Sequence, residues 1–295
     1  MQDTVQPVQK LKQTIEQISN LPTPPMVFQQ INKVINDPKT SAYDIAAIIS
    51  EDPAMSVKIL KLSNSAFYGS RQEVTSVKQA IVIMGLEAVK SMVLSSAVFD
   101  MFKGSVKDPQ FQEDFWRHSL ATAFGSRLIV RKLWSNKIIE SEVAFSIGLL
   151  HDIGLLVQYA YLPDDFAKVR EVARESVISR HKAEEQVLGY THADVGALLA
   201  RKWNLPHQLQ DAVENHHYPQ LSQAETNDAY IVHFADYLAH VAFDSSEDDT
   251  RNESILNESI FEVLDITKEQ VDTFKSKLVG EYAKAETFMQ MAMAC

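Results

Sequence analysis

The sequence has only one cysteine, Cys295, and few glycines or prolines. A single cysteine excludes an intramolecular disulfide and a cysteine-rich zinc site, and it fits a reducing compartment. Only 9 Gly and 10 Pro occur in 295 residues, and there is no Asn-Gly or Asp-Gly dipeptide. These dipeptides are the strongest short hairpin signals, so an all-β fold is disfavoured. Phosphate loops of the GxGxxG and GxxxxGK[ST] types are also missing, which disfavours Rossmann and P-loop enzymes.

The charge balance is acidic. The chain carries 39 Asp and Glu against 28 Lys and Arg, a formal net charge of −11. A protein that grips phosphate backbone usually leans basic, so we expect no nucleic-acid partner. The first 17 residues lack the apolar segment of a signal peptide. The most apolar long stretch, 143–163, is interrupted by His151-Asp152, so we expect a cytoplasmic protein without a membrane span.

Helical periodicity dominates the rest of the chain. Apolar residues make up 45% of the sequence, enough for a sizeable core. They recur at helical spacing, as in Val27, Ile31 and Val34, and Pro53 and Ser76 mark expected helix starts. We therefore predict an all-α fold: an N-terminal helical bundle at 1–105, a helical core at 106–243, an acidic linker at 244–254 and a C-terminal helical segment at 255–295. Within the core, helices are predicted at 110–133, 140–160, 164–178, 181–202, 206–217 and 225–243.

Ionisable residues stand on three otherwise apolar helical faces. His118 lies on the stripe of Phe111 and Phe115, the pair His151-Asp152 interrupts the run at 140–160, and Asp236 lies in a segment that is apolar almost all round. An unpaired buried carboxylate costs several kcal/mol. A metal cation would accept both imidazole nitrogen and carboxylate oxygen. The alternative for each residue is a hydrogen bond to a buried neighbour.

Further histidines follow in the same half of the chain. His192 opens an amphipathic helix, and His216-His217 ends the helix that begins near Pro206. Asp114, one turn before His118, is placed to be an outer ligand or to orient His118. The order of these residues along the chain is His, His-Asp, His, His-His, Asp.

This order resembles the HD-domain superfamily of metal-dependent phosphohydrolases, whose quartet falls on His118, His151, Asp152 and Asp236. The additional His192, His216 and His217 resemble extra ligands of the HD-GYP branch, which cleaves cyclic di-GMP. Longer motifs over roughly residues 15–240 look closely like the HDOD domain: LPTPPMVFQQINKVINDP, IAAIISEDPAMSVKILKLSNSAFYG, SVKQAIVIMGLEAVKSMVL, FWRHSLATA, GLLHDIGLLV, THADVGALLARKWNLP and ENHH.

The resemblance implies a helical bundle packed on an HD-type core. It also implies a divalent metal site formed by His118, His151, Asp152, His192, His216, His217 and Asp236. Such ligation suits Fe, Mn, Zn, Co or Ni, and likeness to HD-GYP proteins favours Fe or Mn. HDOD domains are mostly regarded as non-catalytic bacterial signalling modules, which implies other signalling proteins as partners.

Two departures from the HD-GYP pattern bear on catalysis. Leu155 stands where catalytic relatives have a lysine after HDxG, and the Gly-Tyr-Pro loop after the double histidine is absent. A lysine there would help to neutralise a phosphodiester transition state. Three hypotheses remain open: a signalling module with a retained metal site, a metal-dependent phosphohydrolase or phosphodiesterase acting on a phosphate ester or cyclic dinucleotide, and a helical protein whose buried His and Asp residues only satisfy each other. Phe67 and Tyr68 are candidate exposed aromatics for a protein partner.

Overall fold

The structure is a computed structural model that describes residues 11, 26–34, 40–64, 73–102, 104–134, 138–243 and 255–293. Every regular element in these ranges is helical, and no strand occurs among them. The predicted all-α fold class is confirmed. Phe67, Tyr68, the linker at 244–254 and Cys295 lie outside the described residues.

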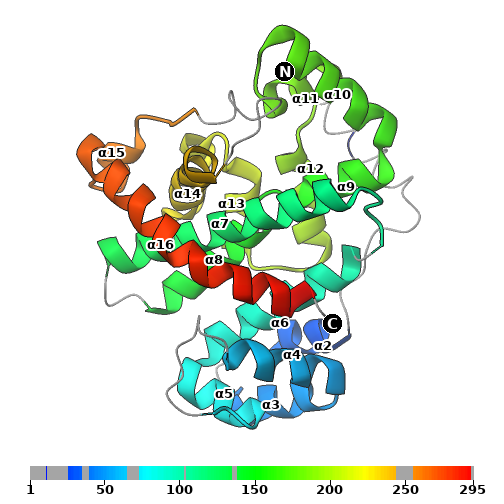
Figure 1. The fold of residues 1–295 in the computed structure, drawn as a ribbon, viewed down its shortest axis with the longest axis vertical. Helices are drawn as coiled ribbons and strands as arrows, with labels where there is room; N and C mark the ends of the chain where they lie inside the picture. Colours follow the sequence, from blue (N-terminus) through cyan, green and yellow to red (C-terminus); the bar gives the residue numbers. More distant parts are fainter. Residues whose placement is uncertain are drawn as a thin grey trace.

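Among the described residues, the N-terminal lobe, at the bottom of Figure 1, contains five short to medium helices. Side-chain caps fix the starts of three of these helices. Ser41 and Asp44 form a capping box, and Asp52 caps the helix that begins at Pro53. The Ser76 hydroxyl accepts a hydrogen bond from the backbone N–H of Gln79. The expected starts at Pro53 and Ser76 are thus confirmed. The helices are α2 (Met26–Val34), α3 (Ala42–Ser50), α4 (Pro53–Ser63), α5 (Val77–Met84) and α6 (Leu86–Phe102).

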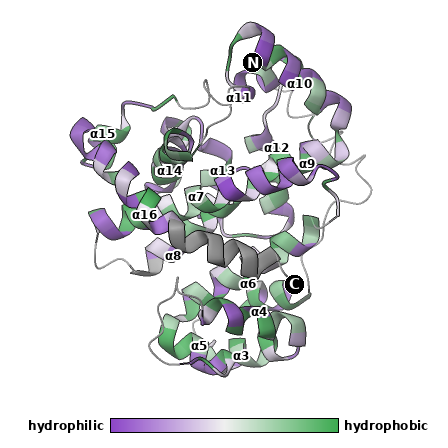
Figure 2. Cartoon of the chain, viewed as in Figure 1, coloured by the Kyte–Doolittle hydropathy of each residue, from purple (hydrophilic) through white to green (hydrophobic). Residues whose placement is uncertain are grey.

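The lobe buries its apolar residues between these helices. Ile45, Ile49, Ile59 and Ala80 are fully buried. In Figure 2, α5 at the bottom of the molecule is coloured mainly hydrophobic, and α10 at the opposite end is coloured mainly hydrophilic. α6 is buried over most of its surface because it packs on the lobe and also on the larger part of the molecule.

The larger part of the molecule is built around a long central helix, α7, that packs against α8 and α14. The Trp116 ring of α7 is buried against Phe99 of α6, with ring centroids 4.1 Å apart. The helices after the N-terminal lobe are α7 (Pro109–Leu133), α8 (Ile138–Leu150), α9 (Ile153–Tyr161), α10 (Pro163–Ser176), α11 (Arg180–Val187), α12 (His192–Lys202), α13 (His207–Asn215), the short 3-10 turn Pro219–Leu221, α14 (Asp228–Phe243), α15 (Ile260–Val263) and α16 (Lys268–Met293).

The last helix joins the two parts of the molecule. α16 packs on α7 and α14 and also touches α4 and α6 of the N-terminal lobe, and it crosses the molecule diagonally in Figure 1. The helical character predicted for the C-terminal segment is therefore found in α15 and α16. The predicted boundary between bundle and core stays a prediction, because α6 and α16 contact both sides of it.

Two long helices of the prediction are wrong, because each is broken in the structure. The segment 140–160 divides at His151 and Asp152, which form a turn between α8 and α9. The segment 181–202 divides after α11, where Gly189 adopts a positive φ of 78° and Thr191 caps α12 with a capping box. A continuous helix would distribute these ionisable side chains around its axis. Because each helix is broken, the side chains next to the break point inward instead.

One stretch of the described chain, Glu140–Tyr161, is long and apolar enough by composition to cross a membrane. Its most apolar window is 78% buried inside the fold, and the stretch is interrupted by the turn at Asp152. It is therefore accounted for by the core of this fold.

We expect the contact between the two parts of the molecule to carry much of the stability. Replacing the fully buried Trp116 with alanine should lower the free energy of unfolding by about 3–5 kcal/mol, because it removes a large apolar ring and leaves a cavity. Urea denaturation followed by circular dichroism measures this change. The matched Val82→Ala, at a side chain that is 72% exposed, should change it by less than about 0.5 kcal/mol. Equal effects of the two substitutions would contradict the assignment.

Candidate metal centre

The turn between α8 and α9 places two ionisable residues at the centre of the molecule. His151 is fully buried, and the Asp152 side chain is 11% exposed. The His151 Nδ1–H donates to the carbonyl oxygen of Gly148 over 2.8 Å. Because a carbonyl oxygen only accepts, Nε2 is the ring nitrogen left for a ligand. It lies 3.3 Å from Asp152 Oδ2.

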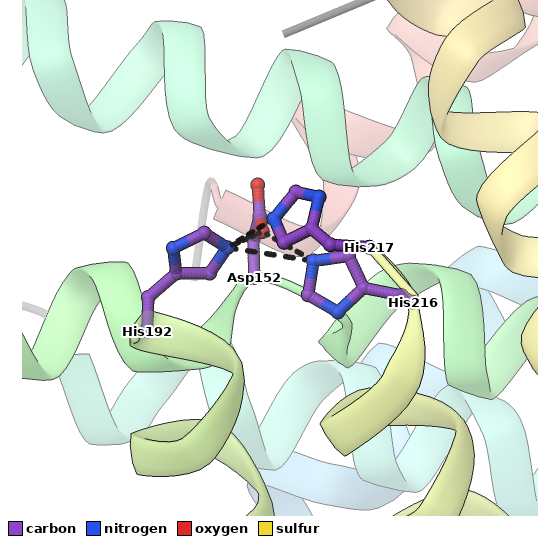
Figure 3. A group of neighbouring side chains, drawn as sticks. All are labelled: Asp152, His192, His216 and His217. Atoms are coloured by element: carbon purple, nitrogen blue, oxygen red, sulfur yellow. Dashed lines mark hydrogen bonds and ion pairs between the residues drawn. The ribbon is translucent and has the colours of Figure 1, made fainter. Parts of the chain in front are cut away.

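Three histidines from later in the chain surround Asp152, as Figure 3 shows. His192 begins α12, and His216 and His217 directly follow α13. His192 Nε2 lies 3.1 Å from Asp152 Oδ1, 3.4 Å from His216 Nε2 and 2.9 Å from His217 Nε2. The His216 Nδ1–H donates to the Val213 carbonyl over 2.8 Å, so this ring also directs Nε2 to the centre.

A close helix crossing brings His192 to Asp152. At Gly154, two residues after Asp152, an added Cβ would lie 1.9 Å from the His192 carbonyl oxygen. No side chain fits in that space, so glycine allows α9 and α12 to approach at this point. The crossing therefore positions one ligand candidate against another.

The remaining two predicted ligands approach from α7 and α14. His118 Nε2 lies 3.3 Å from His151 Nε2, 3.7 Å from Asp152 Oδ2 and 3.0 Å from Asp236 Oδ1. Asp236 Oδ1 also lies 3.6 Å from His151 Nε2. All seven residues predicted as ligands thus converge on one region. That they bind metal stays a prediction.

The prediction for Asp114 is corrected by the structure. Its side chain is 52% exposed, and it pairs with Arg117 at 3.2 Å and accepts from Gln110. These contacts direct it to Arg117 and Gln110 and not to His118. Asp114 lies one helical turn, about 6 Å, nearer the start of α7, where the helix face is open to solvent.

The two buried carboxylates remain ionised because imidazoles surround them. Burial opposes the charge of Asp152, but the charge of His151 and contacts from His192 and His216 outweigh it and hold the pKa of Asp152 well below its usual value. Burial lowers the pKa of His151, yet Asp152 and Asp236 raise it overall to about 10. Without a metal, His151 would therefore hold a second proton, which a divalent cation displaces when it binds.

Two rings of the cluster, those of His216 and His217, are kept neutral. Burial and the neighbouring imidazoles lower the pKa of His216 and, more strongly, of His217. Neutral imidazole is the form that ligates metals. His216 and His217 are therefore already in the form that binds a cation. Burial lowers the pKa of His192, but Glu184 and Asp152 raise it overall, so this ring must lose a proton before it binds one.

The donor set fits a divalent metal. Three groups of ligand atoms each lie within 4.8 Å of one another: Asp152, His192, His216 and His217; His118, His151 and Asp152; and His118, Asp236 and His240. Two donors that each lie about 2.0–2.2 Å from one ion and subtend 90–110° are roughly 2.8–3.6 Å apart, the range of most distances in the cluster. Nitrogen and carboxylate donors suit Fe, Mn, Zn, Co and Ni. Such an ion, when bound, polarises a phosphoryl oxygen and lowers the pKa of bound water.

Comparison with protein families now places the chain. The family model of the HDOD domain matches residues 21–219. The chain belongs to the HDOD family. The match covers the N-terminal lobe and six of the seven predicted ligands, and Asp236 lies beyond it.

Solved structures share this fold. An HDOD domain protein of unknown function from Geobacter sulfurreducens has a TM-score of 0.74 at 23% identity, over 97% of this chain and 96% of that chain. A candidate signal transduction protein from Marinobacter aquaeolei has a TM-score of 0.79 at 19% identity, over 98% of this chain and 66% of that one. A candidate metal-dependent phosphohydrolase from Shewanella amazonensis has a TM-score of 0.61 at 20% identity, over 96% and 99%. At these identities the likeness establishes the fold.

A curated relative is longer than this chain. An uncharacterized protein of Treponema pallidum is 25% identical over 202 residues, which are 68% of this chain and 38% of the relative. The chain thus matches well under half of the length of that relative.

The structure of this HDOD protein adds three residues that the sequence patterns did not assign to the site. Glu184 is fully buried on α11, and its Oε2 accepts from both the backbone N–H and the Nδ1–H of His192, at 2.8 and 2.7 Å. His181, also on α11, stacks on His217 with centroids 4.2 Å apart. Burial and neighbouring histidines lower its pKa to about 3. His240 Nε2 lies 3.2 Å from Asp236 Oδ1.

Only one of these additions had a sequence signal. His240 follows Asp236 at the i+4 spacing of one helix face. His181 and Glu184 lie between Asp152 and His192 in the sequence, on a separate helix, and the ligand pattern did not include them. Conversely, His233 is not in the cluster: its Nδ1–H donates to the His216 carbonyl, and its Nε2 accepts from the Asn257 backbone N–H.

We expect Glu184 to control metal affinity through His192. Glu184→Gln removes the charge that orients His192 and raises its basicity, so affinity for a divalent ion should fall about 10- to 100-fold. A competition titration against a chromogenic chelator measures this. Glu185→Gln, at the exposed neighbouring position, is the matched control and should leave affinity unchanged. Equal affinities of the two variants would exclude the positioning role.

Proposed function

We propose that this HDOD chain is a signalling module that holds divalent metal in the cluster around Asp152 and acts through other signalling proteins. The observation that carries the proposal is the convergence of the seven predicted ligand side chains, with His151 and His216 anchored through Nδ1 and directing Nε2 inward. Anchoring of this kind is typical of metal-ligating histidines. We favour Fe or Mn from the resemblance to HD-GYP proteins, and a cytoplasmic location.

Access to the cluster supports a non-catalytic role. The side chains of His118 and Asp152 are only 13% and 11% exposed, His217 is partly buried, and His216 is fully buried. The carboxylates of Asp152 and Asp236 are only 11% and 6% exposed, which leaves little surface for a substrate as large as a cyclic dinucleotide to contact. Leu155, at the position of the catalytic lysine in HD-GYP relatives, instead packs against the hydrophobic core. It supplies no donor to a phosphoryl group.

The cleft that borders the cluster has the wrong charge for a phosphodiester. A cleft of about 520 Å³ reaches His217. Its lining includes four carboxylates, and its one arginine, Arg201, pairs with Glu214 at 2.8 Å. The other three carboxylates are Glu185, Asp194 and Asp211. Carboxylates so arranged repel an anionic substrate.

A second candidate function is metal-dependent phosphoester hydrolysis. It is favoured by one observation: adjacent donor groups share Asp152, as a carboxylate that bridges two metal ions would require. Two neighbouring ions can activate water and stabilise a leaving oxygen. Turnover is therefore the measurement that separates the two candidates.

We expect metal without hydrolysis. Protein purified without chelator, or reconstituted with Mn²⁺ or Fe²⁺, should contain about two ions per chain by elemental analysis and should cleave cyclic di-GMP no faster than Asp152→Ala. Each missing transition-state donor costs about a hundredfold or more in rate. The Asp152→Ala variant should itself lose most of the bound metal, because Asp152 belongs to two of the three donor groups.

Hydrolysis well above the Asp152→Ala level would establish the phosphohydrolase instead. An absence of metal from the reconstituted protein would overturn both candidates. It would leave a helical protein whose buried His and Asp residues satisfy one another.

A further inference from the structure

A histidine outside the predicted ligand set faces the exposed side of the cluster. His240 lies on α14, one turn after Asp236, and its side chain is 12% exposed. Its Nε2 lies 3.2 Å from Asp236 Oδ1, and His118 Nε2 lies 3.0 Å from the same oxygen. The His118 and His240 rings are 4.4 Å apart between centroids. These three residues form a donor group of their own.

The distances in this group are those of neighbouring ligands on one ion. Donors bound at about 2.0–2.2 Å with angles of 90–110° are roughly 2.8–3.6 Å apart. Both nitrogen-to-oxygen distances lie inside that range. The same oxygen, Asp236 Oδ1, is buried, and the Nε2 atoms of His118, His240 and His151 lie 3.0, 3.2 and 3.6 Å from it. A buried carboxylate oxygen surrounded by ring nitrogens requires either protonated imidazoles or a shared cation, and a divalent ion bound by the neutral rings would supply the second.

The backbone holds this arrangement in place. Asp236 and His240 are four positions apart on α14, so they lie on one helix face. α14 packs directly on α7, which supplies His118. The donors therefore come from two packed helices rather than from loops, and binding need not pay to order them.

We propose that His240 is a metal ligand, which together with His118 and Asp236 holds the cation on the exposed side of the cluster. His192, His216 and His217 hold the other cation, and Asp152 lies between the two. This inference rests on the proposed metal-binding function. It extends the ligand set by one residue that the HD and HD-GYP resemblance does not include.

The assignment has a consequence for affinity. An imidazole nitrogen binds one ion, so removal of His240 should affect only the outer cation. Loss of the His240 ligand should weaken binding of the outer cation, the one held by His118 and Asp236, at least tenfold. The inner cation, the one held by His192, His216 and His217, keeps all of its donors. The effect is therefore selective for one of the two ions.

The experiment compares His240→Gln with the unmodified chain and with His207→Gln. His207 is an exposed histidine on α13 that belongs to none of the donor groups. Each protein is stripped, reconstituted with Co²⁺ and titrated, with visible absorption and elemental analysis as readouts. Circular dichroism confirms that each variant is folded.

We expect two ions for the unmodified chain and for His207→Gln. His240→Gln should keep one tight ion and bind the second at least tenfold more weakly, with a changed Co²⁺ absorption band. His240→Glu, which supplies an oxygen donor at the same position, should restore much of the second binding event. This rescue separates ligation from a packing role of the ring.

Each other outcome has a distinct meaning. Two ions with unchanged affinity in His240→Gln would show that His240 and Asp236 form only an ion pair within the helix, and the inference would fail while the metal centre stands. Equal loss of both ions, without rescue by glutamate, would assign His240 to packing and also overturn the inference. No ion in the unmodified chain would overturn the proposed function itself.

Discussion

The structure depends on how the charge of a buried carboxylate, Asp152, is balanced. A carboxylate in this setting is tolerated only if cations or several donors surround it. Here the surrounding imidazoles come from four places in the chain: α7, the turn after α8, the start of α12 and the end of α13. Asp236 of α14 contacts two of the same imidazoles, those of His118 and His151. The requirement to balance one charge thus ties together the elements of the core.

Several local features of the fold serve this arrangement. The helix that would run from 140 to 160 ends early, so that His151 and Asp152 both turn inward. Gly154 lets α9 approach the His192 carbonyl oxygen. Glu184 fixes the orientation of His192. A second layer of polar contacts therefore supports the residues that face the centre, as metal sites require.

The same geometry bears on what the protein does with a metal. The residues of the cluster are largely buried, the neighbouring cleft is acidic, and the position after Gly154 is occupied by Leu155, which is partly buried and packs against the core. Under the proposed function, a metal ion would link α7, α12, α13 and α14 and so stabilise one packing of the helices. Because metal would bind the folded arrangement and not the unfolded chain, occupancy would be coupled to stability. Under the proposed function, the module would transmit its state through its surfaces rather than through a product.

Local features could be predicted from the sequence because they depend on residues within one or two helical turns. These include the helical periodicity, the starts at Pro53 and Ser76, and the ionisable residues on apolar faces at His118, His151, Asp152 and Asp236. The family resemblance joined the ligand candidates into one set. It could not supply their distances.

Tertiary packing decided the rest. Asp114 has the spacing of a partner for His118, yet it lies where α7 meets solvent and pairs with Arg117. Glu184 contacts His192 only because the turn between α11 and α12 brings the two side chains together, and His240 lies beside His118 only because α14 packs on α7. The sequence by itself determined which groups need partners. Only the packing of helices distant in the chain determined which partners they have, because those distances depend on close approach at sites such as Gly154 and not on any local pattern.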